Sequence, residues 1–571
     1  MTPRGYTLLV GLAASTILRA QPASPFDSGV WCGNVSPTSV NVVARLTSAG
    51  QRVRLQVSPN ASLSPAIFST VATTADTAGN TLALSVAGLK PDTDYYYGLE
   101  VAGALRIEPA SRGRFRTFPF GRGSFKIAFG GDSHYGHADQ RAFDAIVAER
   151  PLLFIHLGDL HYNDTNSINV DDYRANYDRV LNQPNQSALY RSIPLAYMWS
   201  DHDFCGNDSD GTAIGRDAAR AVYKERVPHY PIATNAGGTM AQAFTIGRVR
   251  VIMTDTRSAA HSPNVKESAT KTRLGAGQKA WFKQELISAR DSGAPLILWA
   301  NPDPWIGAAA LGSDMWAGYA TERTELANFI RDNRIANVVS ISTDMHALAY
   351  DDGANSDYAT GGGAPITVLH ASALTADGSI KGGPYSGGAL AGSQQYGILE
   401  IYDTGGPSVA CRFLGMRVGE GPKLTYIFSS SAVGAADRAL INISTLARVA
   451  SATDSIVSGF VISGSTSRSM LVRAIGPTLA AFGVADPLGG ARLSLYQGDR
   501  LIATNGGWAG TAEGAAPLSA AFDRAGAFRL LDENSGDAAL VMTLAPGAYT
   551  VQVTSADGRP GTALLEVYEV Q

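Results

Sequence analysis

Acidic and histidine side chains directly follow several apolar runs in the middle of the chain, where they could bind metal ions. The chain has nine histidines, and all of them lie between His134 and His370. Carboxylates combined with imidazoles and a phenol suit hard to borderline divalent or trivalent metals. Metal binding or acid–base chemistry is therefore expected in this middle region. The segments concerned are Asp132-Ser133-His134, Gly158-Asp159-Leu160-His161-Tyr162, Asp201-His202-Asp203, Asp255-Thr256-Arg257 and Asp344-Met345-His346.

Residues of these types favour a hydrolase that uses two metal ions. A shared aspartate can bridge two ions about 3.5–4 Å apart, and a water molecule between them ionises near neutral pH. Phosphate esters suit such a site, because the ions neutralise the oxygen atoms on which negative charge develops. A single aspartate after a strand could instead cap a helix. Five such strand ends, four of them with a histidine within two residues of the aspartate, favour one shared site.

From residue 124 to about 425 the pattern alternates between strands and helices. Phe125–Phe129 and Leu152–Ile155 are apolar runs, and residues 140–150 between them carry apolar side chains at helical spacing. A strand, a helix and a second strand in this order predict a parallel sheet that is buried on both faces. Ligand sites in such sheets form outside the carboxyl ends of the strands. Further strands are predicted at Ile193–Trp199, Val249–Met253, Pro295–Trp299, Val338–Ile341 and Ile366–Leu369.

Two all-β segments flank this α/β region. Residues 28–118 show strand patterns, and Leu89–Tyr95 is similar to the corner of a fibronectin type III-like sandwich, where a tyrosine fixes the loop. Small residues at 426–437 indicate a linker. Short strands between glycine turns predict a second β-sandwich at 438–571, which is similar to a C-terminal module of secreted bacterial proteins. This module has no histidine or cysteine, so we expect surface attachment or passive stabilisation from it.

The composition is that of a folded protein with several domains. A length of 571 residues, 45% of them hydrophobic, is enough for roughly three or four domains. The 46 basic and 50 acidic residues give a net charge of −4, so the chain carries no nucleic-acid-binding signature and no strongly basic surface for membranes. The three cysteines allow at most one disulfide.

Residues 1–20 are predicted to be a signal peptide. Arg4 precedes an apolar stretch from Thr7 to Leu18, which is too short to span a bilayer, and a proline-containing segment follows it. A buried first strand is the alternative interpretation of this stretch. No later run is long and apolar enough to span a membrane. We therefore expect a secreted, periplasmic or cell-surface protein.

Together the motifs resemble those of the metallophosphoesterase superfamily and, more closely, of the alkaline phosphatase D (PhoD-like) family. The similarity extends over roughly residues 28–420 and includes the stretch from Asp314 to Arg323. It implies a central α/β domain at 122–425, an αββα sandwich, with the two all-β sandwich domains on either side. The implied function is that of a secreted phosphoesterase, which hydrolyses phosphate mono- or diesters by attack of a metal-bound hydroxide on phosphorus.

The resemblance also assigns roles to the motif residues. His202 would act near the leaving group as proton donor or transition-state stabiliser, and Asp159 would bridge two metal ions. The implied ions are Fe³⁺ and a divalent ion such as Ca²⁺, Mn²⁺ or Zn²⁺. Asp201 and Asp344 stand where the superfamily has asparagine and often histidine, so the second ion would have more oxygen ligands. The implied metal ligands are Asp132, His134, Asp159, Tyr162, Asp201, Asp344 and His346.

Two other functions are consistent with parts of the sequence. Gly131-Asp132-Ser133 also resembles the start of a serine esterase, but no histidine of this chain follows an aspartate by three residues, as that family requires. The second is a non-catalytic surface-binding protein with a degenerate phosphoesterase domain. It is motivated by Asp344 and by the missing histidine of a further superfamily motif, for which Asn301 is only a positional candidate. The otherwise intact motifs argue against it.

Arg257 and Cys205 each have two possible roles. Arg257 could contact phosphate, or it could brace its loop through a carboxylate. Cys205 follows His202 closely in the sequence and could approach a metal, although a small loop residue is the simpler interpretation.

Overall fold

In this computed structural model the chain divides into two compact units, Met1–Gly434 and Ala435–Gln571. The predicted signal peptide and residues 432–437 of the predicted linker lie outside the residues that the structure describes. In the described ranges, no helix has the length and apolar character needed to cross a membrane. These ranges are 26–431, 443–462, 467–510, 515–525, 527–530, 532–545 and 547–570.

A nine-stranded sheet runs through the first unit and joins its N-terminal part to the predicted catalytic region. The connection is a parallel pairing of Gly33 with Leu195. The N-terminal β-sandwich expected at 28–118 therefore shares a sheet and a hydrophobic core with the α/β region. In sheet order the strands are β22 (Gly421–Ser431), β21 (Ser408–Arg417), β20 (Gln395–Tyr402), β10 (Phe125–Gly130), β11 (Leu153–Leu157), β12 (Leu195–Met198), β1 (Trp31–Gly33), β2 (Ser39–Arg45) and β6 (Thr81–Ala87).

A second, six-stranded sheet completes the N-terminal sandwich. Its buried valines and leucines pack against those of β2 and β6 in one core. As the sequence predicts, the Tyr95 hydroxyl fixes the corner, because it accepts a hydrogen bond of 2.9 Å from the Lys90 backbone N–H. The strands are β4 (Ile67–Phe68), β3 (Arg52–Ser58), β7 (Asp94–Val101) and β8 (Ala104–Leu105), with β5 (Ala72–Thr73) and β9 (Arg112–Arg116) paired to β3 and β7.

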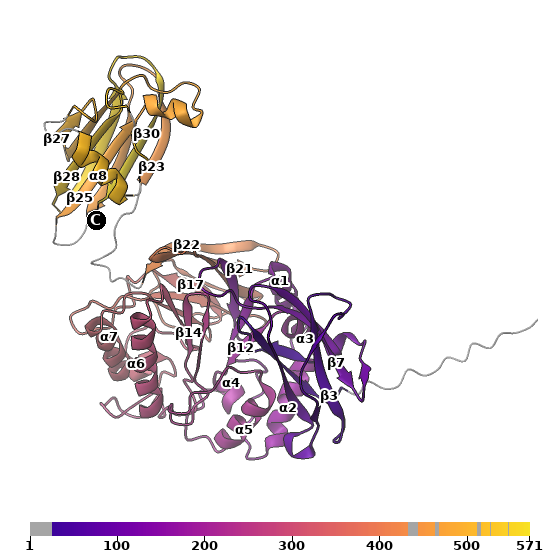
Figure 1. Cartoon of the computed structure of the whole chain (residues 1–571). Coiled ribbons are helices and arrows are strands. Elements are labelled where there is room, and N and C mark those ends of the chain that lie inside the picture. Colours follow the sequence, from indigo (N-terminus) through magenta and orange to yellow (C-terminus); the bar gives the residue numbers. More distant parts are fainter. Residues whose placement is uncertain are drawn as a thin grey trace, which may run out of the picture. The chain divides into compact units, whose positions relative to one another are not determined.

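A seven-stranded sheet forms the other half of the α/β region. Alternate residues of its strand β15 face opposite ways: Leu298 joins the core shared with the nine-stranded sheet, and Trp299 joins the core under α6 and α7. These two helices lie together beside this sheet (Figure 1). In sheet order the strands are β13 (Gln242–Ile246), β14 (Val249–Met253), β15 (Leu296–Ala300), β16 (Val338–Ser342), β18 (Thr367–Ala371), β17 (Ala347–Asp351) and β19 (Ala389–Ala391).

Helices cover the outer faces of both sheets, so the layers are helix, sheet, sheet, helix. The helix predicted at 140–150 is α1, whose Phe143 and Ile146 are fully buried. On the nine-stranded side, α3 contacts β1 and α1 contacts both α3 and β20. The helices of this unit are α1 (Arg141–Glu149), α2 (Val170–Asn182), α3 (Pro184–Ser192), α4 (Asp201–Phe204), α5 (Arg216–Arg226), α6 (Gly275–Asp291) and α7 (Ala320–Asp332).

The carboxyl ends of the two parallel strand groups meet at one place. β10, β11 and β12 are parallel neighbours in one sheet, and β14, β15 and β16 are parallel neighbours in the other. The hydroxyl of Thr343, just after β16, donates to the backbone carbonyl of Leu157 at the end of β11. The loops that carry the acidic motifs of both sheets are thereby brought together.

The second unit is a β-sandwich of two four-stranded sheets with a common core. The first unit extends further than expected: residues 426–431, assigned to the linker from their small side chains, form the end of β22, where Tyr426 and Phe428 pack against the core. The strands of the second unit are β23 (Ile443–Val449), β30 (Gly561–Glu569), β25 (Arg468–Ile475) and β28 (Ala538–Leu544), then β24 (Ile456–Ile462), β29 (Gly547–Ser555), β26 (Ala491–Gln497) and β27 (Arg500–Asn505), with helix α8 (Ala515–Ala525).

Candidate metal centre

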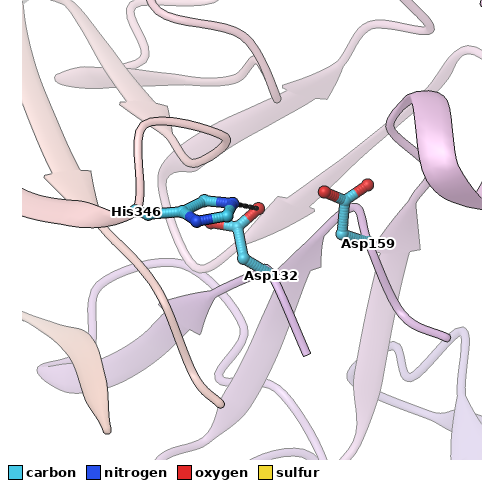
Figure 2. A group of neighbouring side chains, drawn as sticks. All are labelled: Asp132, Asp159 and His346. Atoms are coloured by element: carbon cyan, nitrogen blue, oxygen red, sulfur yellow. Dashed lines mark ion pairs between the residues drawn. The ribbon is translucent and has the colours of Figure 1, made fainter. Parts of the chain in front are cut away.

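Asp132, Asp159 and His346 come together at the carboxyl ends of β10, β11 and β16 (Figure 2). One ligand atom from each of these side chains lies within 4.8 Å of the others. His346 Nε2 is 3.7 Å from Asp132 Oδ1. His346 Nδ1 lies 2.7 Å from the Asp377 carbonyl, so its N–H donates there and Nε2 is left as an acceptor. Two carboxylates and a neutral imidazole nitrogen are suitable metal ligands.

The two carboxylates of this group are buried without the partners that buried charges normally have. Asp132 and Asp159 are fully buried. Among the described residues, none of their four carboxylate oxygens has a hydrogen-bond partner, and Asp344 Oδ2 also lacks one. Burying a charged group without pairing costs several kcal/mol, on the order of the whole stability of a domain. Bound cations would provide the missing partners, so the residues present fit the metal ions that the sequence predicts.

Most of the expected ligands have a strained backbone. Five of the seven adopt the left-handed conformation, with φ between 55° and 64°. A residue with a β-carbon loses about 1–2 kcal/mol there, somewhat less for aspartate. Strain of this kind persists where the surrounding structure fixes it, and it concentrates at functional sites. The five residues are Asp132, Asp159, Tyr162, Asp344 and His346.

A second group joins the first through Asp159. Ligand atoms of Asp159, Asp201 and His202 lie within 4.8 Å of one another. His202 Nδ1 is 2.5 Å from Asp164 Oδ1, and its ring stacks on Tyr162 with 3.8 Å between the ring centroids. Asp164 therefore accepts the Nδ1 proton and fixes the ring, which leaves Nε2 free for another partner. Asp159 is in both groups, which is the position expected of a bridging ligand.

Tyr162 and His134 lie at the edge of the first group. The Tyr162 hydroxyl is 3.1 Å from His346 Nε2. The structure does not place His134 in either carboxylate–imidazole group. Its ring centroid is 5.7 Å from that of Tyr162, and its Nδ1 accepts a hydrogen bond from the Gly136 N–H, so Nε2 is the nitrogen left to bind an ion.

The carboxylates of the site perturb one another strongly. Burial first, and then the neighbouring charges of Asp201 and Asp132, hold the pKa of Asp159 well above its ordinary value. Burial likewise raises the pKa of Asp344 to about 7, although Lys381 opposes this. The pKa of Asp201 is lowered despite its burial, because Arg257 and His202 favour its charged form. The region around Asp159 thus has an excess of negative charge that a cation would relieve.

Arg257 is a buried side chain that holds two aspartates of the site in place. Its side chain is 2% exposed, donates to Asp303 at 2.7 Å and lies 3.7 Å from Asp201. Of its two possible roles, the structure favours bracing.

Asp255, whose motif also suggests a site residue, is structural, because its carboxylate accepts hydrogen bonds from the Trp199 indole N–H and the Met240 backbone N–H. Its satisfied oxygens contrast with those of Asp132 and Asp159.

The serine esterase interpretation finds no support in this geometry. Ser133 is 1% exposed, and its hydroxyl bonds the backbone carbonyls of Asp159 and Leu160. His156 Nε2 is 3.1 Å from that hydroxyl, but its Nδ1 has no partner among the described residues. A nucleophilic serine needs an exposed hydroxyl and an oriented histidine.

Cys205 is buried against the Tyr173 hydroxyl at 3.4 Å, so it acts as a packed loop residue.

Three residues of the site had no assigned role in the sequence. Asp164, which orients His202, lies five residues after Asp159, and this close spacing was an available signal. Asp303 holds both Arg257 and Arg273, the latter through a 2.7 Å bond from Nε. Lys381, whose ammonium is 3.1 Å from Asp344 Oδ1, is in a glycine-rich loop with no motif of its own.

Two models of one protein family match this chain. The model of the PhoD-like phosphatase matches residues 127–386, and that of the PhoD-like phosphatase N-terminal domain matches residues 11–119. The chain belongs to the PhoD-like phosphatase family. The first match includes every expected ligand together with Asp164, Lys381 and His202, so the whole candidate centre of this PhoD-like phosphatase lies in the family's phosphatase domain.

Known relatives extend the comparison. Alkaline phosphatase D of Bacillus subtilis (strain 168) is 25% identical over 307 residues, which are 46% of this chain. The match spans 52% of the Bacillus protein, about half its length. The solved structure of PhoD superposes with a TM-score of 0.61 at 19% identity, covering 73% of this chain and 92% of that one. The part of the chain that superposes therefore has the same fold as PhoD.

Proposed function

We propose that this PhoD-like phosphatase is a metal-dependent hydrolase of phosphate mono- or diesters. The observation that carries the proposal is the meeting of Asp132, Asp159 and His346, with four buried carboxylate oxygens that lack hydrogen-bond partners among the described residues. A non-catalytic binding protein would have no need to keep unpaired buried charge at strained backbone positions. The alkaline phosphatase activity named for the Bacillus relative supports the same conclusion.

The expected ligands would form two sets, one for each metal ion. One ion would be held by Asp132, His134, Tyr162 and His346. The other ion would be held by Asp201 and Asp344. Asp159 would be a ligand of both. Two bound ions would supply Lewis acidity toward the phosphoryl oxygens and acidify a water molecule. Iron with calcium, manganese or zinc is the pair we propose, because the first ligand set contains imidazole and phenol and the second is rich in oxygen.

His202 would donate a proton to the leaving group. The 2.5 Å contact with Asp164 fixes the protonated Nδ1, so Nε2 is the atom that would carry and release the proton. The side chain is 12% exposed, which allows contact with a substrate entering from solvent.

Purified protein is expected to contain about two metal ions per chain and to lose its activity on chelation. The reason is the two ligand groups that share Asp159. Elemental analysis gives the metal content, and release of p-nitrophenol from p-nitrophenyl phosphate and its bis-ester gives the activity before and after chelation. Active protein without stoichiometric metal would contradict the proposal, and metal-loaded protein that releases no p-nitrophenol would support a degenerate, non-catalytic domain.

We also propose that the enzyme is secreted after removal of residues 1–20. The support is the short apolar stretch from Thr7 to Leu18 after Arg4. N-terminal sequencing of the protein recovered from its native host should find a start near Ala20, and a retained Met1 would show that no cleavage occurs.

A further inference from the structure

Lys381 reaches the metal centre from the loop between β18 and β19. Its ammonium Nζ lies 3.1 Å from Asp344 Oδ1. The side chain of Asp344 is 3% exposed, whereas that of Lys381 is 37% exposed. A positive charge is therefore partly open to solvent directly beside the buried carboxylates of the site.

The backbone around Lys381 is fixed in this position. Its carbonyl accepts a hydrogen bond of 3.2 Å from the Tyr385 hydroxyl. Gly383 donates its N–H to the Ile306 carbonyl at 3.2 Å. Gly382 has φ 71° and lies so close that a β-carbon would be 2.1 Å from the Ile306 carbonyl oxygen. The loop is thus held against the segment after β15, and the ammonium is directed to Asp344 by the fold.

The arginines that pair with aspartates of the site are too buried to contact a substrate. Two arginines, Arg257 and Arg273, form ion pairs with the aspartates of the site, and their side chains are 2% and 1% exposed. Both donate to Asp303 beneath the site. Of the described lysines and arginines that pair with Asp201, Asp303 or Asp344, Lys381 is the one with a partly exposed side chain.

We propose that Lys381 is a substrate-binding residue that donates hydrogen bonds to the phosphoryl oxygens. An ammonium has three N–H donors, and the contact with Asp344 uses one of them. Asp344 Oδ2 is buried without a hydrogen-bond partner among the described residues. Asp344 can therefore bind a metal ion through Oδ2 while its Oδ1 keeps the contact with Lys381. This inference rests on the proposed function, and it adds a protein cation to the anion-binding charge of the site.

The test compares Lys381→Met with Lys381→Arg and with the matched control Lys266→Met, an exposed lysine on another loop at this end of the sheets. Metal content and thermal melting are measured first. Inorganic phosphate is then titrated into each metal-loaded protein by calorimetry. Lys381→Met should bind phosphate at least about tenfold more weakly at unchanged metal content, which corresponds to losing a charge-assisted hydrogen bond. Lys381→Arg should retain most of the affinity, and Lys266→Met all of it.

Two results would overturn the inference. Lys381→Met could bind phosphate as tightly as the wild type, or its loss of phosphate binding could follow a loss of metal, in which case Lys381 only positions Asp344. Either result leaves the proposed function intact as long as the wild-type protein hydrolyses p-nitrophenyl phosphate. Wild-type protein that binds two metals but neither hydrolyses the ester nor binds phosphate would instead refute the proposed function itself.

Discussion

Replacing Asp159 with alanine is expected to remove bound metal and activity together. Asp159 is the residue common to both ligand groups, so the substitution takes one ligand from each of them. Losing even an outer partner of a metal ligand costs about 10–100-fold in affinity or activity. A shared ligand should cost more, so we expect kcat/KM to fall by more than about 100-fold and the metal content to fall well below that of the wild type. Elemental analysis and p-nitrophenyl phosphate hydrolysis measure the two losses.

A companion variant, Asp159→Asn, shows whether such losses reflect unfolding. In chelated protein Asp159 is buried near other carboxylates, which holds its pKa well above that of an unfolded aspartate, about 3.9. The folded state therefore keeps a proton that the unfolded chain has lost, and this contribution to stability decreases as pH rises above about 4. Asparagine carries no charge, so the variant should melt a few degrees higher than the wild type in chelator, with an advantage that grows from pH 5 to pH 8.

Thermal melting in the presence of a chelator at several pH values measures this difference. Asp217→Asn is the matched control, because the Asp217 side chain is 82% exposed and should change melting little. If Asp159→Asn melted below the wild type throughout, Asp159 would have a structural role. The metal loss in Asp159→Ala would then be a consequence of unfolding rather than of a missing ligand.

The strand ends that carry the site were predictable from the sequence, because their signal is local. An apolar run followed by glycine and aspartate predicts both a buried parallel strand and a polar group at its carboxyl end. That reasoning located Asp132 and Asp159 without knowledge of the fold. It could not separate them from Asp255, which follows a strand in the same way. The difference lies in the partners of the oxygens, and only the tertiary structure supplies them.

Contacts between distant parts of the chain were not predictable. The parallel pairing of Gly33 with Leu195 joins the N-terminal sandwich to the α/β region, and no local pattern encodes a partner that far along the chain. The contact of Lys381 with Asp344 could not be predicted from the sequence for the same reason. The small serines at the end of β22 predict a linker, although Tyr426 and Phe428 before them alternate as a strand does. Cleavage at residue 20 and the identity of the metals stay predictions.

Replacing His202 with alanine is expected to keep the metals and to lose most of the turnover. The side chain is held through Nδ1 by Asp164, so its Nε2 is placed to give a proton to the leaving group. General acid catalysis contributes about 10²–10⁴-fold, so kcat for an alkyl phosphate should fall within that range. The loss should be smaller for p-nitrophenyl phosphate, because p-nitrophenolate leaves without a proton. His137→Ala is the matched control, since its ring lies 4.8 Å from that of His134 at the same site and carries no assigned role.

The same measurements decide between the two roles that the geometry allows for His202. One of its nitrogens is within 4.8 Å of the Asp159 and Asp201 carboxylates, a position that would also suit a metal ligand. If His202→Ala loses metal as fully as Asp159→Ala does, His202 is a ligand and the proton must come from another group. If it keeps its metal and retains near-wild-type turnover of the alkyl phosphate, the acid role is wrong. A loss that depends on the leaving group at constant metal content is the result that only a proton donor produces, because a lost ligand would slow both substrates.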